Sequence, residues 1–223
     1  SLPLPEDVSA LYRQLKEEGA TRILHICMSG SLSGTYNMVS ILADETDDLH
    51  VDVVDAQTLS CGTGLLVLEA AECLERGMPV EDVIERLRTL RKHQLGAFVI
   101  RTLEYLRKGG RCSAVAALGA NMLGLRPCIQ VKDGKMGVGK KYRGAYNKCL
   151  LQYVKERLEG RDDIDTRRIF VTNSGGFTDE EVQAVVDEVK KYQPFEEVIC
   201  NRAGCTISCH CGPRTLGILY FHK

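Results

Sequence analysis

The stretch TRILHICMSGSLSGTYNMVSILADE, residues 21–45, decides the fold class. Its apolar opening, residues 21–27, predicts a buried strand, and its end, residues 34–45, has apolar residues at helical spacing. Between them lies SGSLSGT, residues 29–35, a loop of small hydroxyl side chains and glycines. A strand that runs through a short loop into a helix is the repeating unit of α/β folds.

The same alternation continues on both sides of this stretch. Further helices are predicted over residues 5–20, 62–77 and 79–93, and further strands over 50–56 and 95–101. This order favours a mainly parallel sheet covered by helices, in a first α/β domain over residues 1–96.

The rhythm changes after Arg101, and we predict a second α/β domain, a mixed sheet with helices, over residues 97–223. Its predicted hairpin turns at the dipeptide Asp133-Gly134. Its expected elements are, in order, two helices around a glycine-rich break (102–125), a hairpin (126–143), a helix (144–160), a strand (167–173), a helix opened by a Thr178/Glu181 capping box (178–192), a strand (196–202) and a final turn and strand (211–223).

Composition excludes several classes of protein. The 223 residues are 44% hydrophobic and 26% charged, which is ordinary for a globular protein. A net charge of -1 and the absence of Trp argue against a nucleic-acid partner. No apolar run approaches the ~20 residues of a membrane-spanning helix, so we expect no stable membrane insertion. Ten scattered cysteines are read as reduced thiols in a cytoplasmic protein.

The hydroxyl-rich loop at residues 29–35 is the first candidate site. Ligands of parallel sheets bind beyond the carboxyl ends of the strands, and a helix N-terminus favours an anion. The serine hydroxyls add neutral donors, which suits one carboxylate or phosphate. The alternative is that Ser33 caps the following helix while the other hydroxyls are solvated. The loop lacks the Gly-Lys-Ser/Thr of a Walker motif.

Three further segments carry polar residues. In RKGGR, residues 107–111, Arg111 and two glycines suit an anion site or, equally well, a helix C-cap. Asp55, at the end of a predicted strand, is a candidate general base, but a capping or bracing role is favoured. The turn at Asp133-Gly134 is given no chemistry.

The segment around His210 is rich in cysteine. A metal or thiol-redox site there would use Cys205, Cys209, Cys211 and His210, but this spacing matches no zinc pattern. Neighbouring residues on a strand also point to opposite faces. We therefore predict no metal, and His210 is either structural or a proton-handling residue.

Together these motifs resemble the DegV family of bacterial fatty-acid-binding proteins, the lipid-binding subunits of fatty-acid kinase. The resemblance covers nearly the whole chain. Its motifs are SLSGTYN (31–37), DAQTLSCGTGLLVLEAA (55–71), FVIRTLEYLRKGGRCS (98–113), LRPCIQVKDGKM (125–136) and HCGPRTLGILYF (210–221).

The resemblance implies two α/β domains that clasp one fatty acid, with its carboxylate in the interdomain cleft and its acyl chain in a buried tunnel. By position, Ser33 matches the serine that donates to the carboxylate, and His210 matches the head-group histidine. Ser29, Gly34 and Thr35 complete the expected carboxylate site.

The family's mode of action implies a partner. An ATP-dependent kinase subunit would phosphorylate the bound carboxylate to an acyl phosphate, so this chain is expected to be non-catalytic by itself and to need no cofactor beyond its lipid. Arg111 and Arg143 match family arginines that serve phosphate transfer or kinase contact.

The sequence departs from the family pattern in three places. The family has further residues before the segment that corresponds to residues 1–5, so we expect a trimmed chain or a separate polypeptide that supplies them. VTNSGG, residues 171–176, replaces the family's His-Ala or His-Gly. Arg214 stands where glycine is usual, which is expected to add positive charge beside His210.

Two other functions stay open from the residues alone. One is a hydrolase with Ser33 or a cysteine as nucleophile, His210 as base and Asp55 as the bracing acid. The other is a metal or redox module built on the three cysteines near His210. No Gly-x-Ser-x-Gly elbow supports the hydrolase.

Overall fold

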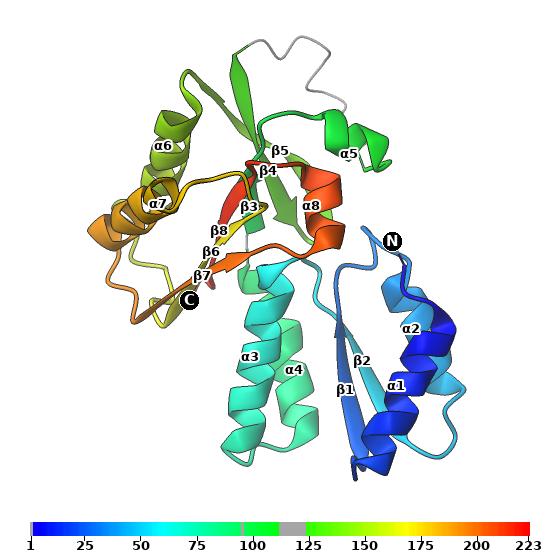
Figure 1. Ribbon diagram of the computed structural model, residues 1–223. Helices are drawn as coiled ribbons and strands as arrows, with labels where there is room; N and C mark the ends of the chain where they lie inside the picture. The colour runs from blue at the N-terminus through cyan, green and yellow to red at the C-terminus, as the bar shows by residue number, and fades with distance from the viewer. Residues whose placement is uncertain (1, 95, 112–123) are drawn as a thin grey trace. The chain divides into compact units, whose positions relative to one another are not determined.

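A computed structural model describes residues 2–94, 96–111 and 124–223 (Figure 1). The chain divides into two compact units. Unit 1 comprises Ser1–Leu59, Thr63–Lys92 and Asp133–Lys135, and unit 2 comprises Ser60–Gly62, His93–Lys132 and Met136–Lys223. The predicted helix that follows Arg111 falls on residues 112–123, outside the described residues.

Unit 1 is built on a pair of parallel strands. Their register runs from Arg22 opposite His50 to Cys27 opposite Asp55, so both strands end at the same edge. The elements of the unit are α1 (Pro5–Glu17), β1 (Arg22–Cys27), α2 (Thr35–Asp44), β2 (His50–Asp55), α3 (Cys61–Glu75) and α4 (Val80–Leu90).

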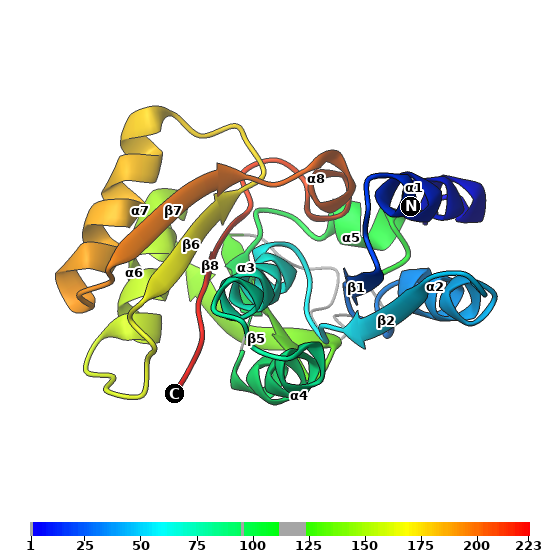
Figure 2. The ribbon, with the colours of Figure 1, turned by 90° about the horizontal axis from the view of Figure 1, so that it is seen from below.

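Helices cover both sides of this strand pair, as Figure 2 shows, with α1 and α2 on one side and α3 and α4 on the other. Tyr12 of α1 and Val39 of α2 pack in one apolar cluster with Ile23 and Cys27 of β1. This arrangement follows from the alternation of apolar strand and amphipathic helix in the sequence.

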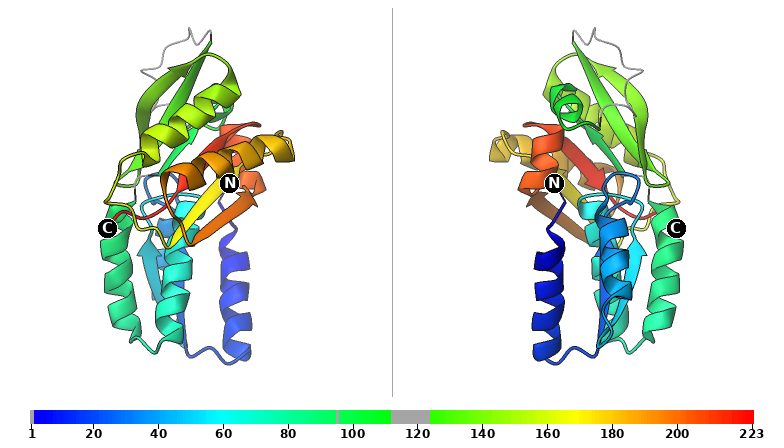
Figure 3. Two further views of the ribbon diagram at one scale, coloured as in Figure 1. Left: turned by 90° about the vertical axis from the view of Figure 1, so that its left-hand side faces the viewer. Right: turned by 90° about the vertical axis from the view of Figure 1, so that its right-hand side faces the viewer.

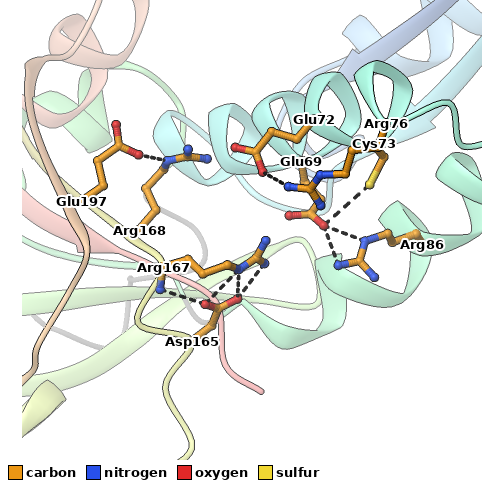
Figure 4. A network of polar contacts seen from close by, with 9 residues as sticks. All are labelled: Glu69, Glu72, Cys73, Arg76, Arg86, Asp165, Arg167, Arg168 and Glu197. Carbon is orange, nitrogen blue, oxygen red and sulfur yellow. Dashed lines mark hydrogen bonds and ion pairs between the residues drawn. The ribbon is translucent and has the colours of Figure 1, made fainter.

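A buried carboxylate links α3 to α4 (Figure 4). Glu69 of α3 is 3% exposed and accepts a hydrogen bond of 2.6 Å from Nε of Arg86 on α4. The thiol of Cys73, one turn along α3, lies 3.8 Å from the same carboxylate oxygen. A carboxylate this buried needs such partners because desolvation penalises its charge.

Unit 2 contains a six-stranded sheet in the order β5-β4-β3-β8-β6-β7. The pairs that join β3 to β4, β3 to β8 and β6 to β8 are antiparallel, whereas β6 and β7 are parallel, so the sheet is mixed, as the sequence predicted. The elements are a short 3₁₀ helix (Arg91–His93), β3 (Gly96–Val99), α5 (Glu104–Lys108), β4 (Leu125–Lys132), β5 (Lys135–Arg143), α6 (Tyr146–Leu158), β6 (Arg168–Asn173), α7 (Asp179–Tyr192), β7 (Glu197–Arg202), α8 (Cys205–Cys211) and β8 (Leu216–Leu219).

Helices α6 and α7 lie side by side against this sheet (Figure 3). Tyr153 of α6 is fully buried, and its hydroxyl donates to the carbonyl of Ala97 at 2.7 Å and accepts from the N–H of Ile218 at 3.0 Å. One side chain thus ties the helix to both β3 and β8. The predicted capping box of α7 is confirmed, with Thr178 and Glu181 bonded reciprocally.

One predicted element is wrong. The region around His210 is not strand-like as predicted, because Cys205–Cys211 forms the helix α8. Glycines flank this helix: Gly204 is its N-cap, and Gly212 follows it with a φ of 77°. Within the described part of the chain, no helix is long and apolar enough to cross a membrane.

Candidate functional site

The hydroxyl-rich loop follows β1, at the edge where both strands of unit 1 end. Ser29 is fully buried there, and its hydroxyl donates to the carbonyl of Gly134 at 2.7 Å. Its backbone N–H donates to the carbonyl of Thr58 at 2.8 Å, and its Oγ accepts from the N–H of Ser31 at 3.2 Å. Ser29 therefore anchors the loop, since its one hydroxyl proton is used within unit 1. Its predicted contact with a ligand carboxylate stays a prediction.

Ser33 and Thr35 form a hydroxyl pair at the start of α2. Their side-chain oxygens lie 2.8 Å apart, and both residues are half-buried. The N-cap of α2 is Gly34, which has no side chain to offer. Oγ of Ser33 accepts from the N–H of Thr35, the first residue of α2, at 3.3 Å, so Ser33 satisfies one N–H at the helix start, as the capping alternative expected. One hydroxyl of the pair donates to the other, which leaves one O–H of the pair to donate to a ligand.

Asp55 connects the loop that follows β1 to the loop that follows β2. Its Oδ1 accepts from the N–H of Gln57 at 2.8 Å and from the N–H of Gly30 at 3.3 Å. Gln57 has a φ of 52°, a conformation that a non-glycine residue adopts only when its surroundings hold it. The bracing role that the sequence favoured for Asp55 is therefore what its contacts show.

The turn at Gly134 belongs to unit 1 and contacts the hydroxyl loop. Its φ is 77°, and a Cβ added there would lie 2.7 Å from Oγ of Ser29. No functional role was predicted for this turn from the sequence. Its contact with Ser29 could not be predicted, because 105 residues separate the two partners.

In unit 2, His210 of α8 packs against the glycines that follow α5. A Cβ added to Gly109 would lie 2.1 Å from Nδ1 of His210, so only glycine lets the imidazole approach this closely. Burial, with a further contribution from the positive charge of Arg111, lowers the pKa of His210. The imidazole is therefore neutral at pH 7 and presents one N–H donor.

Two arginines were predicted to face a phosphate or a kinase. Arg111 is exposed, and its guanidinium donates to the carbonyl of Gly109 at 2.8 Å, in the same segment that supports His210. Arg143 is exposed at the end of β5. Within the described ranges, Arg143 has no hydrogen bond with the segment that holds His210. Of the two predicted arginines, Arg111 is the one that lies close to the histidine.

The turn after His210 is fixed by residues that the sequence marked as departures from the family pattern. Ser174 donates to the carbonyl of Gly212 at 2.5 Å and accepts from the N–H of Thr215 at 3.0 Å. A Cβ on Gly212 would lie 2.3 Å from Cδ2 of Tyr105, so the turn also packs closely on α5. These contacts hold the C-terminal end of α8 in place.

Arg214 was predicted to add positive charge beside His210, but it pairs with Glu181 instead. Its guanidinium forms a two-pronged pair with Glu181, at 2.8 and 3.0 Å, and stacks 4.7 Å from the ring centre of Phe177. Hydrogen bonding to Arg214 contributes most to holding the pKa of Glu181 at about 2. The positive charge expected beside His210 is therefore neutralised on α7.

The three cysteines near His210 differ in their environment. Cys205 and Cys209 are exposed, whereas Cys211 is buried and its pKa is raised by that burial. In the part of the chain that the structure describes, no three histidine, cysteine or acidic side chains form a metal-binding group. Nδ1 of His210 is buried without a hydrogen-bond partner, so no described nucleophile is bonded to that nitrogen.

Comparisons with known proteins agree with one another. The family model of DegV matches residues 1–223. A fatty acid-binding protein of Thermotoga maritima is 31% identical over 221 residues, which cover 97% of this chain and 75% of the relative. The structure of a fatty-acid-binding DegV family protein from Thermus thermophilus is 34% identical, with a TM-score of 0.86 over 100% of this chain and 78% of that one. A stearic acid-binding protein from Eubacterium ventriosum is 26% identical, with a TM-score of 0.79 over 100% and 78% of the two chains.

Proposed function

Because the chain belongs to the DegV family, we propose that it binds one long-chain fatty acid and presents the carboxylate to a partner kinase for acyl-phosphate formation. The observation that supports fatty-acid binding is the match over the whole chain to relatives described as fatty-acid-binding proteins, and the kinase step extends the proposal beyond that observation. The acyl chain would be stabilised by burial, at about 0.8 kcal/mol for each CH₂ group.

The carboxylate is held by neutral donors in this proposal. The Ser33–Thr35 pair offers one O–H, and the neutral imidazole of His210 offers one N–H. Hydrogen bonds to a charged group are each worth about 1.5–3 kcal/mol. Such donors hold a carboxylate without a full countercharge, which keeps the carboxylate oxygen available as a nucleophile toward a phosphoryl group.

The charge of the segment from Arg101 to Lys148 supports a contact with an acidic partner. The sequence from Arg101 to Lys148 contains eleven lysines and arginines but only two acidic residues. Lys132, Lys141 and Arg143 are exposed on β4 and β5. A basic surface of this kind steers an acidic protein and raises the rate of association. In the proposed division of labour the kinase supplies ATP and catalyses the transfer, while this chain supplies the bound lipid in the cytoplasm.

Fatty-acid binding by matched variants tests the carboxylate site. The protein is delipidated and titrated with stearic acid, and the double variant Ser33→Ala/Thr35→Val is compared with Ser40→Ala. Ser40 also lies on α2, where its hydroxyl donates to the carbonyl of Tyr36 at 2.8 Å. We expect the double variant to bind about 10- to 100-fold more weakly, because it loses a donor to a charged group.

The control should bind stearic acid as the unmodified chain does. Equal affinity of the double variant and the unmodified chain would overturn the assignment of the hydroxyl pair. His210→Ala is tested in the same way against Thr206→Ala, an exposed residue of α8. The kinase step is tested separately, by transfer of labelled phosphate from ATP to the bound lipid in the presence of the partner enzyme.

A further inference from the structure

Helix α8 exposes two thiols on one face. Cys205 and Cys209 are four residues apart on this helix, and both are exposed and unbridged. Side chains at positions i and i+4 of a helix lie one above the other, with Cβ atoms about 5–6 Å apart. Two sulfur atoms on such side chains turn readily toward a single ion between them.

The surroundings hold this pair in place. The hydroxyl of Ser208 donates to the carbonyl of Ala203 at 3.2 Å, ahead of the helix. The hydroxyl of Thr215 donates to the carbonyl of Cys211 at 2.9 Å, at the end of the helix. The two thiols therefore project from a helix that is secured at both ends.

The other described cysteines offer no such pair. Five are buried: Cys27, Cys73, Cys128, Cys149 and Cys211. Cys61 is half-buried, and its sulfur accepts a hydrogen bond of 3.0 Å from the amide of Asn201. Cys200 is exposed but lies on strand β7. Within the described ranges, Cys205 and Cys209 are thus the one exposed pair that lies a helical turn apart.

The number and type of these ligands select the ion. Thiolates are soft ligands that favour Cu(I), zinc or iron–sulfur clusters. Structural zinc needs four ligands, and iron–sulfur clusters need four cysteines or their equivalent, whereas α8 offers two exposed thiols among the described residues. The helix sequence CTISCHC contains no carboxylate that would attract a hard cation such as Mg²⁺ or Ca²⁺.

We propose that Cys205 and Cys209 form a two-thiolate site for a soft monovalent ion of the Cu(I) class. Binding forms two Cu–S bonds and releases both thiol protons to solvent, and the copper stays in the Cu(I) state throughout. The proposal does not rest on the proposed fatty-acid function, which assigns neither cysteine a contact with the lipid.

Competition for Cu(I) tests the site. The reduced protein is titrated without oxygen against Cu(I) held by the chromogenic chelator bathocuproine disulfonate, and the colour lost by the chelator measures transfer to the protein. Cys205→Ser and Cys209→Ser are compared with Cys200→Ser, which also removes an exposed thiol. Circular dichroism checks that each variant is folded, and all three changes lie at exposed positions.

The proposal predicts one tightly bound Cu(I) in the unmodified chain and in Cys200→Ser. Loss of either paired thiol should weaken binding by more than the ~10- to 100-fold typical of losing an outer-shell partner. Because two protons are released, the affinity should also rise with pH, by up to ~100-fold per unit. Cu(I) binding that is unchanged in both Cys205→Ser and Cys209→Ser would overturn the proposal, as would an X-ray absorption spectrum without two sulfur ligands.

Discussion

At the scale of single residues, Gly134 meets two requirements at once. Its φ is positive, and its missing Cβ leaves room for the hydroxyl of Ser29. Gly160 provides a natural comparison, because it has a φ of 67° but open space around it. A comparison of alanine variants at the two positions therefore measures how much the contact with the hydroxyl loop contributes to stability.

We predict that Gly134→Ala destabilises the protein more than Gly160→Ala does. Both variants pay about 1–2 kcal/mol for a left-handed alanine, and only the first must also displace Ser29. Urea unfolding measures both changes in the free energy of unfolding. If the free energy of unfolding falls by the same amount in both variants, the contact between the turn and the loop does not contribute to stability.

Half-buried histidines give the protein a specific dependence on pH. Burial is the largest cause that lowers the pKa of His25, His210 and His222. Their contribution to stability is full above the unfolded pKa of about 6.5, and it is lost as the pH falls toward the lower folded values. Below about pH 6.5 the unfolded chain binds more protons than the folded one.

The free energy of unfolding should therefore fall between pH 7.5 and pH 5.5, a range that lies above the titration of ordinary carboxylates. Urea unfolding at several pH values measures the slope. His210→Asn should make this slope shallower, since it removes one of the three groups. A free energy of unfolding that is flat across this range would show that the histidines are not protected from protonation in the folded state.

Local signals predicted some residues well and failed at others. The Thr178/Glu181 capping box was found because its partners are three residues apart and its chemistry is local. The pairing of Arg214 with Glu181 was missed because 33 residues and a change of element separate them. The support of His210 by Gly109 was also invisible, although the pair of glycines signalled that something approaches the backbone there.

At the scale of elements, the α3–α4 pair depends on one buried carboxylate. Glu69 is 3% exposed and its carboxylate is hydrogen-bonded to Arg86. Removing this carboxylate therefore breaks a contact between the two helices. Exposed pairs between neighbouring turns, such as Arg88 with Glu85 on α4, contribute little by comparison.

We predict that Glu69→Ala lowers the free energy of unfolding by about 1.5–3 kcal/mol, because it removes the charged hydrogen bond between α3 and α4. The side chain of Arg86 is 41% exposed, so water can solvate the guanidinium that remains. Glu85→Ala, the matched change at an exposed position, should stay within about 0.5 kcal/mol of the unmodified chain. Chemical denaturation of the two variants makes the comparison. Equal effects would mean that Glu69 is not the link between the helices.

Helix α8 shows why elements are harder to predict than the motifs they carry. Its sequence CTISCHC is poor in strong helix formers, and it was read as strand-like. Tertiary packing decides the outcome, because the helix is fixed by Gly109 beneath His210 and by Ser174 at its end. The strands and longer helices were predicted more reliably, since their apolar periodicity extends over many residues.

At the scale of the whole molecule, charge is distributed unevenly along the chain. The net charge of -1 conceals the strongly basic stretch between Arg101 and Lys148. The total charge argued against a nucleic-acid partner, but a sum over the whole chain does not show this local excess of positive charge. A partner that recognises this stretch should associate faster at low salt and more slowly as salt screens the charge.

The α/β architecture and the family were accessible from the sequence because several motifs occur in a fixed order. The length and saturation of the acyl chain were not, because they depend on how side chains from distant segments pack around the lipid. Ligand binding should also stabilise the folded chain, by about 2.7 kcal/mol when the free fatty acid is at 100 times its dissociation constant.

The most direct test of the central claim is native mass spectrometry of the purified protein, followed by denaturing extraction and lipid analysis. We predict a surplus mass that corresponds to one long-chain fatty acid for each chain, and the same lipid in the extract. Delipidated protein should regain the surplus mass when stearic acid is added. A native mass equal to the bare polypeptide, together with no uptake of stearic acid by the folded chain, would contradict the account.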